Sequence, residues 1–113
     1  MISEYTKENR SLTIKLTEEI DQHEVDKMRR TIDNDIERFN PRKVIFDFSN
    51  ISFMDSSGIG MVLGRYKLTK MLDGEFEIIN VNSRMKKIFD MSGVSRIITI
   101  KNVEDDGNER VIW

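Results

Sequence analysis

The residues of this chain with the clearest chemical potential are Asp55-Ser56-Ser57-Gly58. They lie between an apolar run typical of a buried strand, residues 44–48, and a helical pattern over residues 59–71. At such a junction the first N–H groups of the helix lack backbone partners and lie at the positive end of the helix dipole. Asp and Ser are preferred helix caps, but this motif holds more capping groups than one helix needs. A serine here is therefore a candidate to carry a phosphate, and the local pattern leaves open which serine it is.

Enzyme chemistry has little support elsewhere in the chain. The single histidine, His23, falls among polar residues in the first turn of a predicted helix, where we expect a solvated surface residue. A serine nucleophile needs a base within hydrogen-bonding distance, and the chain has no cysteine and no His/Cys cluster for zinc. We therefore expect neither a self-contained hydrolase nor a metal or other cofactor.

Three glycines that follow the serines, Gly58, Gly60 and Gly64, partly imitate a phosphate-binding glycine loop. Their spacing misses the Gly-x-Gly-x-x-Gly fingerprint by one residue, and no Gly-Lys-Ser/Thr follows. Glycines four residues apart on a helix indicate close packing against the sheet or a partner, because each costs about 0.8–1 kcal/mol relative to alanine. Nucleotide binding remains an alternative.

The composition indicates one domain over residues 1–113, with an acidic tail over 102–113. Charged residues make up 34% of the chain and the formal net charge is −2, which argues against direct nucleic-acid binding. No apolar run approaches the roughly 18 residues of a membrane span, and the N-terminus lacks a signal-peptide pattern. We expect a cytoplasmic protein that makes no contact with a membrane.

Apolar periodicity predicts the elements that position the serines. Alternation over residues 12–16 predicts a half-buried strand, and a weaker strand over 4–8 pairs with it across a turn. A helix begins at Asp21, with Glu24 completing a capping box, and ends before Asn40-Pro41. Its apolar stripe comprises Val25, Met28, Ile32, Ile36 and Phe39.

The rest of the chain continues the alternation of strands and helices. Residues 44–48 are nearly all apolar, as in a central strand that is buried on both faces. The later elements are a helix over 59–71, a strand over 76–79, a helix from Asn82 or Ser83 to a C-cap at Gly93, and a strand over 97–100. The alternation predicts an α/β fold, a mixed sheet of four to five strands with helices packed against it. We expect the tail to form a short helix or an ordered coil.

Three segments of the chain resemble one known family. They are Ser52-Phe53-Met54-Asp55-Ser56-Ser57-Gly58-Ile59-Gly60, Leu63-Gly64-Arg65-Tyr66-Lys67 and Ile88-Phe89-Asp90-Met91-Ser92-Gly93. With these motifs the chain resembles the anti-sigma factor antagonists of the STAS domain family over roughly residues 5–101, in particular the sporulation type of endospore-forming bacteria. The order of strands and helices in that family agrees with the order predicted above.

The resemblance implies a switch of partners. In that family the unmodified protein binds an anti-sigma factor that is also a serine kinase, and so frees the sigma factor. The kinase phosphorylates the second serine of the motif, which is Ser57 here, and a PP2C-type phosphatase removes the phosphate. The acidic residue that opens the first helix also contacts the partner, and it corresponds to Asp21. Glu18 departs from the family pattern, because many relatives have glycine there. The protein would then be a kinase substrate and not an enzyme.

The resemblance and the pattern around the serines together give the expected partner-binding residues. Met54 and Met61 are candidates for exposed, adaptable contacts, with burial in the core as the alternative. Ile59 belongs to the inward stripe of its helix, and Arg65 and Lys67 are expected to be solvated. The full expected set is Asp21, Met54, Asp55, Ser56, Ser57, Gly58, Ile59 and Met61.

Two alternatives to this function stay open. A nucleotide-binding or nucleotide-hydrolysing STAS domain would bind ATP or GTP saturably by itself. A stressosome-type scaffold would form a stable high-order assembly in solution. We expect a monomer or a weak dimer instead.

Overall fold

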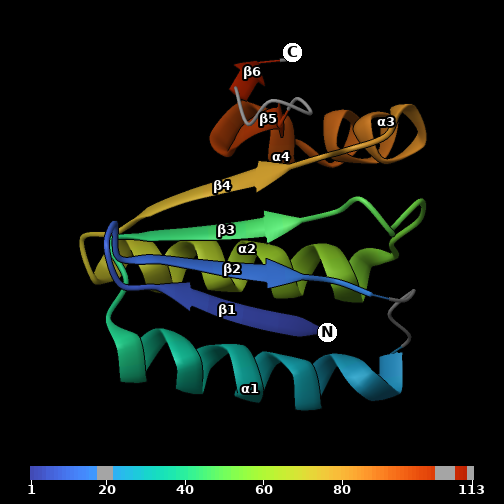
Figure 1. Cartoon of the computed structure of the whole chain (residues 1–113). Helices are drawn as coiled ribbons and strands as arrows, with labels where there is room; N and C mark the ends of the chain where they lie inside the picture. The colour runs from blue at the N-terminus through green and yellow to red at the C-terminus, as the bar shows by residue number, and fades with distance from the viewer. Residues whose placement is uncertain (18–21, 104–108, 112–113) are drawn as a thin grey trace.

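The computed structural model describes residues 1–17, 22–103 and 109–111 of the chain (Figure 1). Within these residues a six-stranded sheet has the strand order β1-β2-β3-β4-β5-β6. The elements are β1 (Ile2–Thr6), β2 (Ser11–Lys15), α1 (Gln22–Phe39), β3 (Lys43–Asp47), α2 (Ser56–Met71), β4 (Glu75–Ile79), α3 (Ser83–Ser92), α4 (Val94–Ile97), β5 (Thr99–Val103) and β6 (Glu109–Val111).

The sheet is mixed, which confirms the predicted fold class. β1 and β2 form an antiparallel hairpin, β2 to β5 are parallel neighbours, and β6 is antiparallel to β5. Parallel neighbours need crossover connections, which α1, α2 and the pair α3–α4 supply. The carboxyl ends of β2, β3 and β4 therefore share one end of the molecule, and α1, α2 and α3 all begin there (Figure 1). We call this end the carboxyl end of the sheet.

Two expectations about the sheet are corrected. Glu109–Val111 form β6 in the tail, where a short helix or an ordered coil was expected, so the described sheet has more strands than the predicted four to five. Residues 44–48 are also not buried on both faces: Val44 and Phe46 are fully buried, whereas Ile45 between them is half-buried. The reason is that helices cover one face of the strand, and α2 passes behind β2 and β3 in Figure 1.

The core lies between the helices and this covered face. The strand register places Leu12, Val44 and Phe76 in one row, and the next row, Ile14, Phe46, Ile78 and Ile100, is buried with it. The other face carries charge. Glu77 there is 5% exposed and lies 3.7 Å from Lys43 Nζ and 3.2 Å from Lys101 Nζ. The sheet is thus apolar on one side and ionic on the other.

The helix α1 follows its predicted stripe. Ile32 and Ile36 are buried, and the other stripe residues pack against the core. Phe39, the last residue of α1, stacks on Tyr5 of β1 with ring centroids 4.5 Å apart. Asn40 then takes a positive φ of 44° before Pro41, which ends the helix as predicted.

An ion pair joins α1 to α2. Arg65 Nε lies 2.8 Å from Asp33 Oδ1, as a close charge contact rather than an aligned hydrogen bond, and Arg65 Nη1 donates to the Met61 carbonyl at 3.3 Å. Arg65 is only 8% exposed, so the expectation of a solvated arginine is wrong, while Lys67 is exposed as expected. Burial lowers the pKa of Arg65, and the Asp33 carboxylate opposes this shift.

Candidate functional site

The serine motif lies at the carboxyl end of the sheet, where α2 begins. Asp55 is the N-cap of α2, with extended backbone angles, and its Oδ1 accepts a hydrogen bond from the Gly58 N–H at 3.1 Å. Ser56 and Ser57 are the first two residues of the helix. Because the aspartate makes the cap, neither serine hydroxyl is needed for it.

The two serines differ in their surroundings. Ser56 is exposed, whereas Ser57 is half-buried and lines a groove of about 410 Å³ between α1 and α2. The other groove residues are Val25, Asp26, Arg29, Gly60, Met61, Gly64 and Arg65. The N–H groups of the first helical turn have no partners within a helix, and no acidic residue occupies the first turn of α2. A phosphate on Ser57 would therefore meet a favourable dipole.

The glycines around the serines have different roles. Gly58 is buried, and a side chain there would collide with that of Met54, so the glycine lets Met54 pack on the start of α2. Gly60 and Gly64 would have no atom within 4 Å of an added Cβ. The expected close packing against the sheet is therefore wrong at these two glycines, and packing against a partner stays a prediction. Both glycines line the groove beside Ser57.

The methionines near the serines belong to the core. Met54 is 4% exposed and Met61 is 3% exposed, so the expectation that they form exposed contacts is wrong and the alternative of burial holds. Both pack into the hydrophobic cluster beneath α2, against which Ile59 also lies partly buried. The exposed apolar residue beside the motif is Phe53, at 52% exposure, which is not among the expected partner-binding residues. No local pattern separates Phe53 from Met54, because the contact that positions its ring comes from α3.

The other end of the expected site falls at the start of α1. Asp21 and Glu18 lie outside the described residues, so their predicted roles stay predictions.

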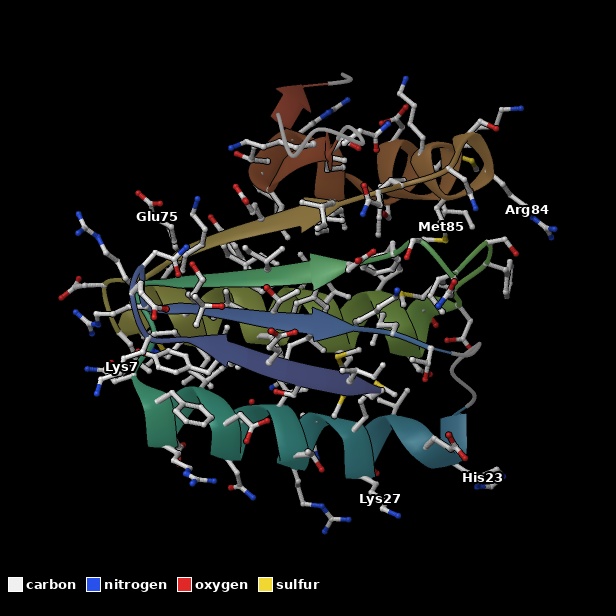
Figure 2. All side chains as sticks on the ribbon, viewed as in Figure 1. Lys7, His23, Lys27, Glu75, Arg84 and Met85 are labelled. Atoms are coloured by element: carbon white, nitrogen blue, oxygen red, sulfur yellow. The ribbon has the colours of Figure 1, made fainter. Side chains whose placement is uncertain are left out.

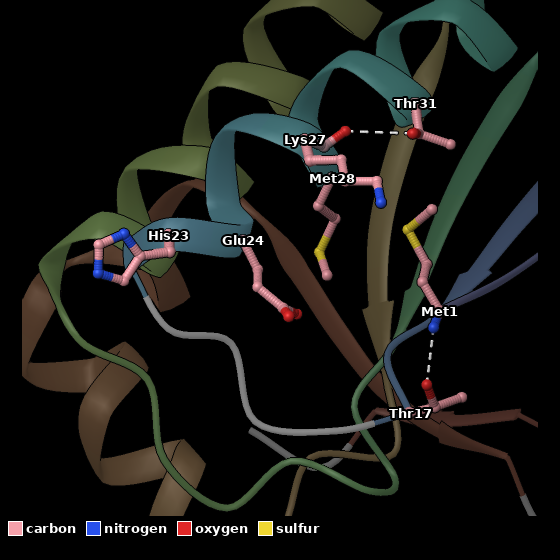
Figure 3. Close-up of a pocket in the computed structure, with 7 residues that line it drawn as sticks. All are labelled: Met1, Thr17, His23, Glu24, Lys27, Met28 and Thr31. Atoms are coloured by element: carbon pink, nitrogen blue, oxygen red, sulfur yellow. Dashed lines mark hydrogen bonds between the residues drawn. The ribbon is translucent and has the colours of Figure 1, made fainter.

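Figure 3 shows a pocket of about 240 Å³ near the start of α1, in which the Met1 ammonium donates a hydrogen bond to Thr17 Oγ1 at 2.7 Å. His23 is exposed, as expected, and its ring points away from Met1 in Figure 3. The pocket is lined by Met1, Thr17, His23, Glu24, Lys27, Met28 and Thr31.

The described part of the chain contains no cluster of side chains suited to bind a metal ion. No group of three or more His, Cys, Asp or Glu residues among the residues placed by the structure could hold a metal ion. What the carboxyl end of the sheet offers is a capped helix start with two spare hydroxyls. Such an arrangement suits modification and binding.

The STAS domain profile matches residues 3–107 of the sequence. The chain belongs to the STAS domain family. This confirms the family inferred from the serine motif and its two companion segments. Among curated proteins, this STAS domain is 38% identical over 93 residues to the anti-sigma F factor antagonist of Paenibacillus polymyxa. The aligned residues cover 82% of this chain and 80% of the relative. It is 34% identical over 84 residues to the protein of the same name from Lysinibacillus sphaericus, covering 74% and 72%. These relatives are named as regulators rather than as enzymes.

Solved structures show the same STAS architecture. The anti-sigma factor antagonist SpoIIAA in its unphosphorylated form superposes with a TM-score of 0.79 at 28% identity, over 93% of this chain and 89% of that chain. The Bacillus cell fate determinant SpoIIAA in its phosphorylated form superposes with a TM-score of 0.72 at 30% identity, over 93% and 92%. None of the helices placed in this STAS domain is long and apolar enough to cross a membrane.

The cap at Asp55 yields a first prediction about the STAS domain. Replacing Asp55 with alanine removes the acceptor for the Gly58 N–H, so the free energy of unfolding is expected to fall by about 1 kcal/mol. Asp55→Ser keeps an acceptor at the same place and is expected to retain most of that stability. Urea denaturation of both variants checks this, and an equal loss in both would show that Asp55 stabilises the fold in another way.

Proposed function

We propose that this protein is an anti-sigma factor antagonist. Its unmodified form binds an anti-sigma factor that is also a serine kinase, and the sigma factor is thereby released. Phosphorylation of Ser57 by that kinase ends the antagonism, and a PP2C-type phosphatase restores it. Because the kinase uses ATP, we expect the protein to act in the cytoplasm. We also expect it to act as a monomer or a weak dimer.

One observation carries the proposal. Asp55 caps α2 by itself, so Ser56 and Ser57 stand at an accessible helix start without a capping role. The names of the curated relatives support the antagonist role, and the existence of a similar protein in phosphorylated and unphosphorylated forms supports a phosphate switch. The resemblance to the family supports the second serine of the motif, Ser57, as the residue that carries the phosphate.

The proposed switch works by local electrostatics. A phosphate on Ser57 adds about −1.5 to −2 charges at neutral pH. In the free protein, water and the start of α2 accommodate this charge, and the dipole favours it by about 0.3–1 kcal/mol. In a complex the partner would displace that water, and a buried charge without a partner costs several kcal/mol. Exclusion of water also strengthens the repulsion between the phosphate and the Asp55 carboxylate beside it. The phosphate therefore opposes the complex without a change of fold.

Mass spectrometry tests the modification directly. After incubation with the anti-sigma factor kinase of the same organism and Mg-ATP, we expect one added phosphoryl group, and fragment mapping should assign it to Ser57. Ser56→Ala should still be modified, whereas Ser57→Ala should not. If the kinase modifies a control substrate but leaves the wild-type protein unmodified, the proposal fails, and a nucleotide titration would then test the alternative of a nucleotide-binding STAS domain.

A further inference from the structure

Phe53 is a large apolar side chain that the loop between β3 and α2 leaves open to solvent. Phe53 is 52% exposed, while Ile51 and Met54 in the same loop are 1% and 4% exposed. The loop therefore buries its other apolar residues and directs this one outward. Single exposed apolar side chains are common on protein surfaces, so exposure alone does not mark a site.

A second residue, Arg84, lies over the exposed ring. The guanidinium carbon of Arg84, in the first turn of α3, is 5.8 Å from the centroid of the Phe53 ring. A cation–π contact of this kind attracts the two groups and restricts the orientation of the ring. Figure 2 shows Arg84 projecting outward at the carboxyl end of the sheet. The pair presents an apolar ring and a positive charge side by side.

Hydrogen bonds of Asn82 hold the two elements of the pair together. Asn82 Nδ2 donates to the Ile51 carbonyl at 3.2 Å, and Asn82 Oδ1 accepts from the Met85 N–H at 2.9 Å as the N-cap of α3. The loop and the start of α3 are thus joined through one side chain. The position of the pair is set by the fold, which lowers the entropy lost when a partner binds it.

The pair adjoins the proposed switch. Phe53 precedes the cap Asp55 by two residues, and Ser57 follows in the first turn of α2. Met71 and Leu72, at 80% and 43% exposure, are at the far end of α2. The remaining exposed large apolar side chains of the described residues lie on β1, α3 and α4: Ile2, Met91 and Ile97. Among the exposed large apolar side chains of the described residues, Phe53 is therefore the one nearest in sequence to Ser57.

We propose that Phe53 and Arg84 form an anchor for the anti-sigma factor, with Phe53 entering an apolar pocket of that partner and Arg84 pairing with a carboxylate at the rim of the pocket. This inference rests on the proposed function and adds α3 to the surface that the partner covers. Buried aromatic and arginine side chains dominate many protein interfaces. An arginine that loses water on binding needs an acidic group, since its charge would otherwise be left unpaired.

Binding measurements with the purified anti-sigma factor kinase of the same organism test the anchor. Phe53→Ala is expected to weaken binding about ten- to hundredfold, and Phe53→Leu less, because leucine keeps part of the apolar volume. Arg84→Gln is expected to weaken binding about threefold to tenfold, with a smaller effect at high salt. Met71→Ala, which removes an exposed side chain at the far end of α2, is the matched control and should change binding less than twofold.

The outcomes separate the anchor from the proposed function. If the wild-type protein binds and is phosphorylated on Ser57 while Phe53→Ala binds within twofold of it, the anchor is overturned and the proposed function stands. If the wild-type protein neither binds nor is phosphorylated, the proposed function fails and the anchor with it. Thermal unfolding of each variant shows whether it is folded. If Phe53→Ala does not fold, the affinity of folded Phe53→Leu is compared with that of the wild type instead, and an unchanged affinity overturns the anchor.

Discussion

Ser57→Asp is expected to bind the anti-sigma factor about ten- to hundredfold more weakly than the wild-type protein, whereas Ser57→Ala should bind as tightly as the wild type. The aspartate places a carboxylate where Ser57 lines the groove between α1 and α2, beside Asp55. A charge that loses water without gaining a partner costs about 1.4 kcal/mol or more in an interface of this kind, and that amount is tenfold in affinity. Isothermal titration calorimetry with the unmodified proteins measures the difference.

The neutral variant Ser57→Asn is the matched control for this experiment. Asparagine has nearly the shape of aspartate but carries no charge, so its binding should stay close to that of Ser57→Ala. Equal weakening by asparagine and aspartate would mean that the groove excludes larger side chains, and the electrostatic switch would then be rejected. Tight binding by all three variants would show that the partner does not cover Ser57.

The second large effect concerns stability and comes from the ion pair between α1 and α2, in which Arg65 is buried and Asp33 is half-buried. Asp33→Ala is expected to lower the free energy of unfolding by about 2–4 kcal/mol, because it leaves the charge of Arg65, whose side chain is 10% exposed, without its acidic partner. The double variant Asp33→Ala/Arg65→Met removes the charge as well and should recover much of the loss. Urea denaturation monitored by circular dichroism gives all three values.

Asp26→Ala provides the control on the same helix. Asp26 pairs with Arg29 at 3.3 Å, but the two side chains are 71% and 48% exposed, so losing this pair should cost less than about 1 kcal/mol. If Asp26→Ala and Asp33→Ala lowered the free energy of unfolding by similar amounts, burial would not be the reason that the Asp33 pair matters more. A double variant no more stable than Asp33→Ala would also count against it, because the cost would then come from lost packing.

The helical stripes and strand alternation could be predicted because they depend on neighbours along the chain. Ile32 and Ile36 recur at helical spacing, and both are buried in α1. Asp55 was recognisable as a possible cap from its place before a helical pattern, and it is the cap. The strand β6 was not recognisable, since a three-residue edge strand needs no more than an available neighbour, here β5.

By itself the sequence determined the family, the order of the strands and of the three longer helices before the tail, and the serine motif at the start of α2. It did not predict the short helix α4, whose last residue Ile97 was expected to begin a strand. These follow from short patterns whose physical cause, backbone hydrogen bonding and apolar periodicity, lies within a few residues. Only the tertiary structure decided that Met54 and Met61 are buried, that Arg65 is paired with Asp33, and that Phe53 is exposed. The environment of each of these side chains depends on elements distant in sequence. Arg84 reaches Phe53 from α3, and Asp33 reaches Arg65 from α1, so no pattern along the chain records either contact.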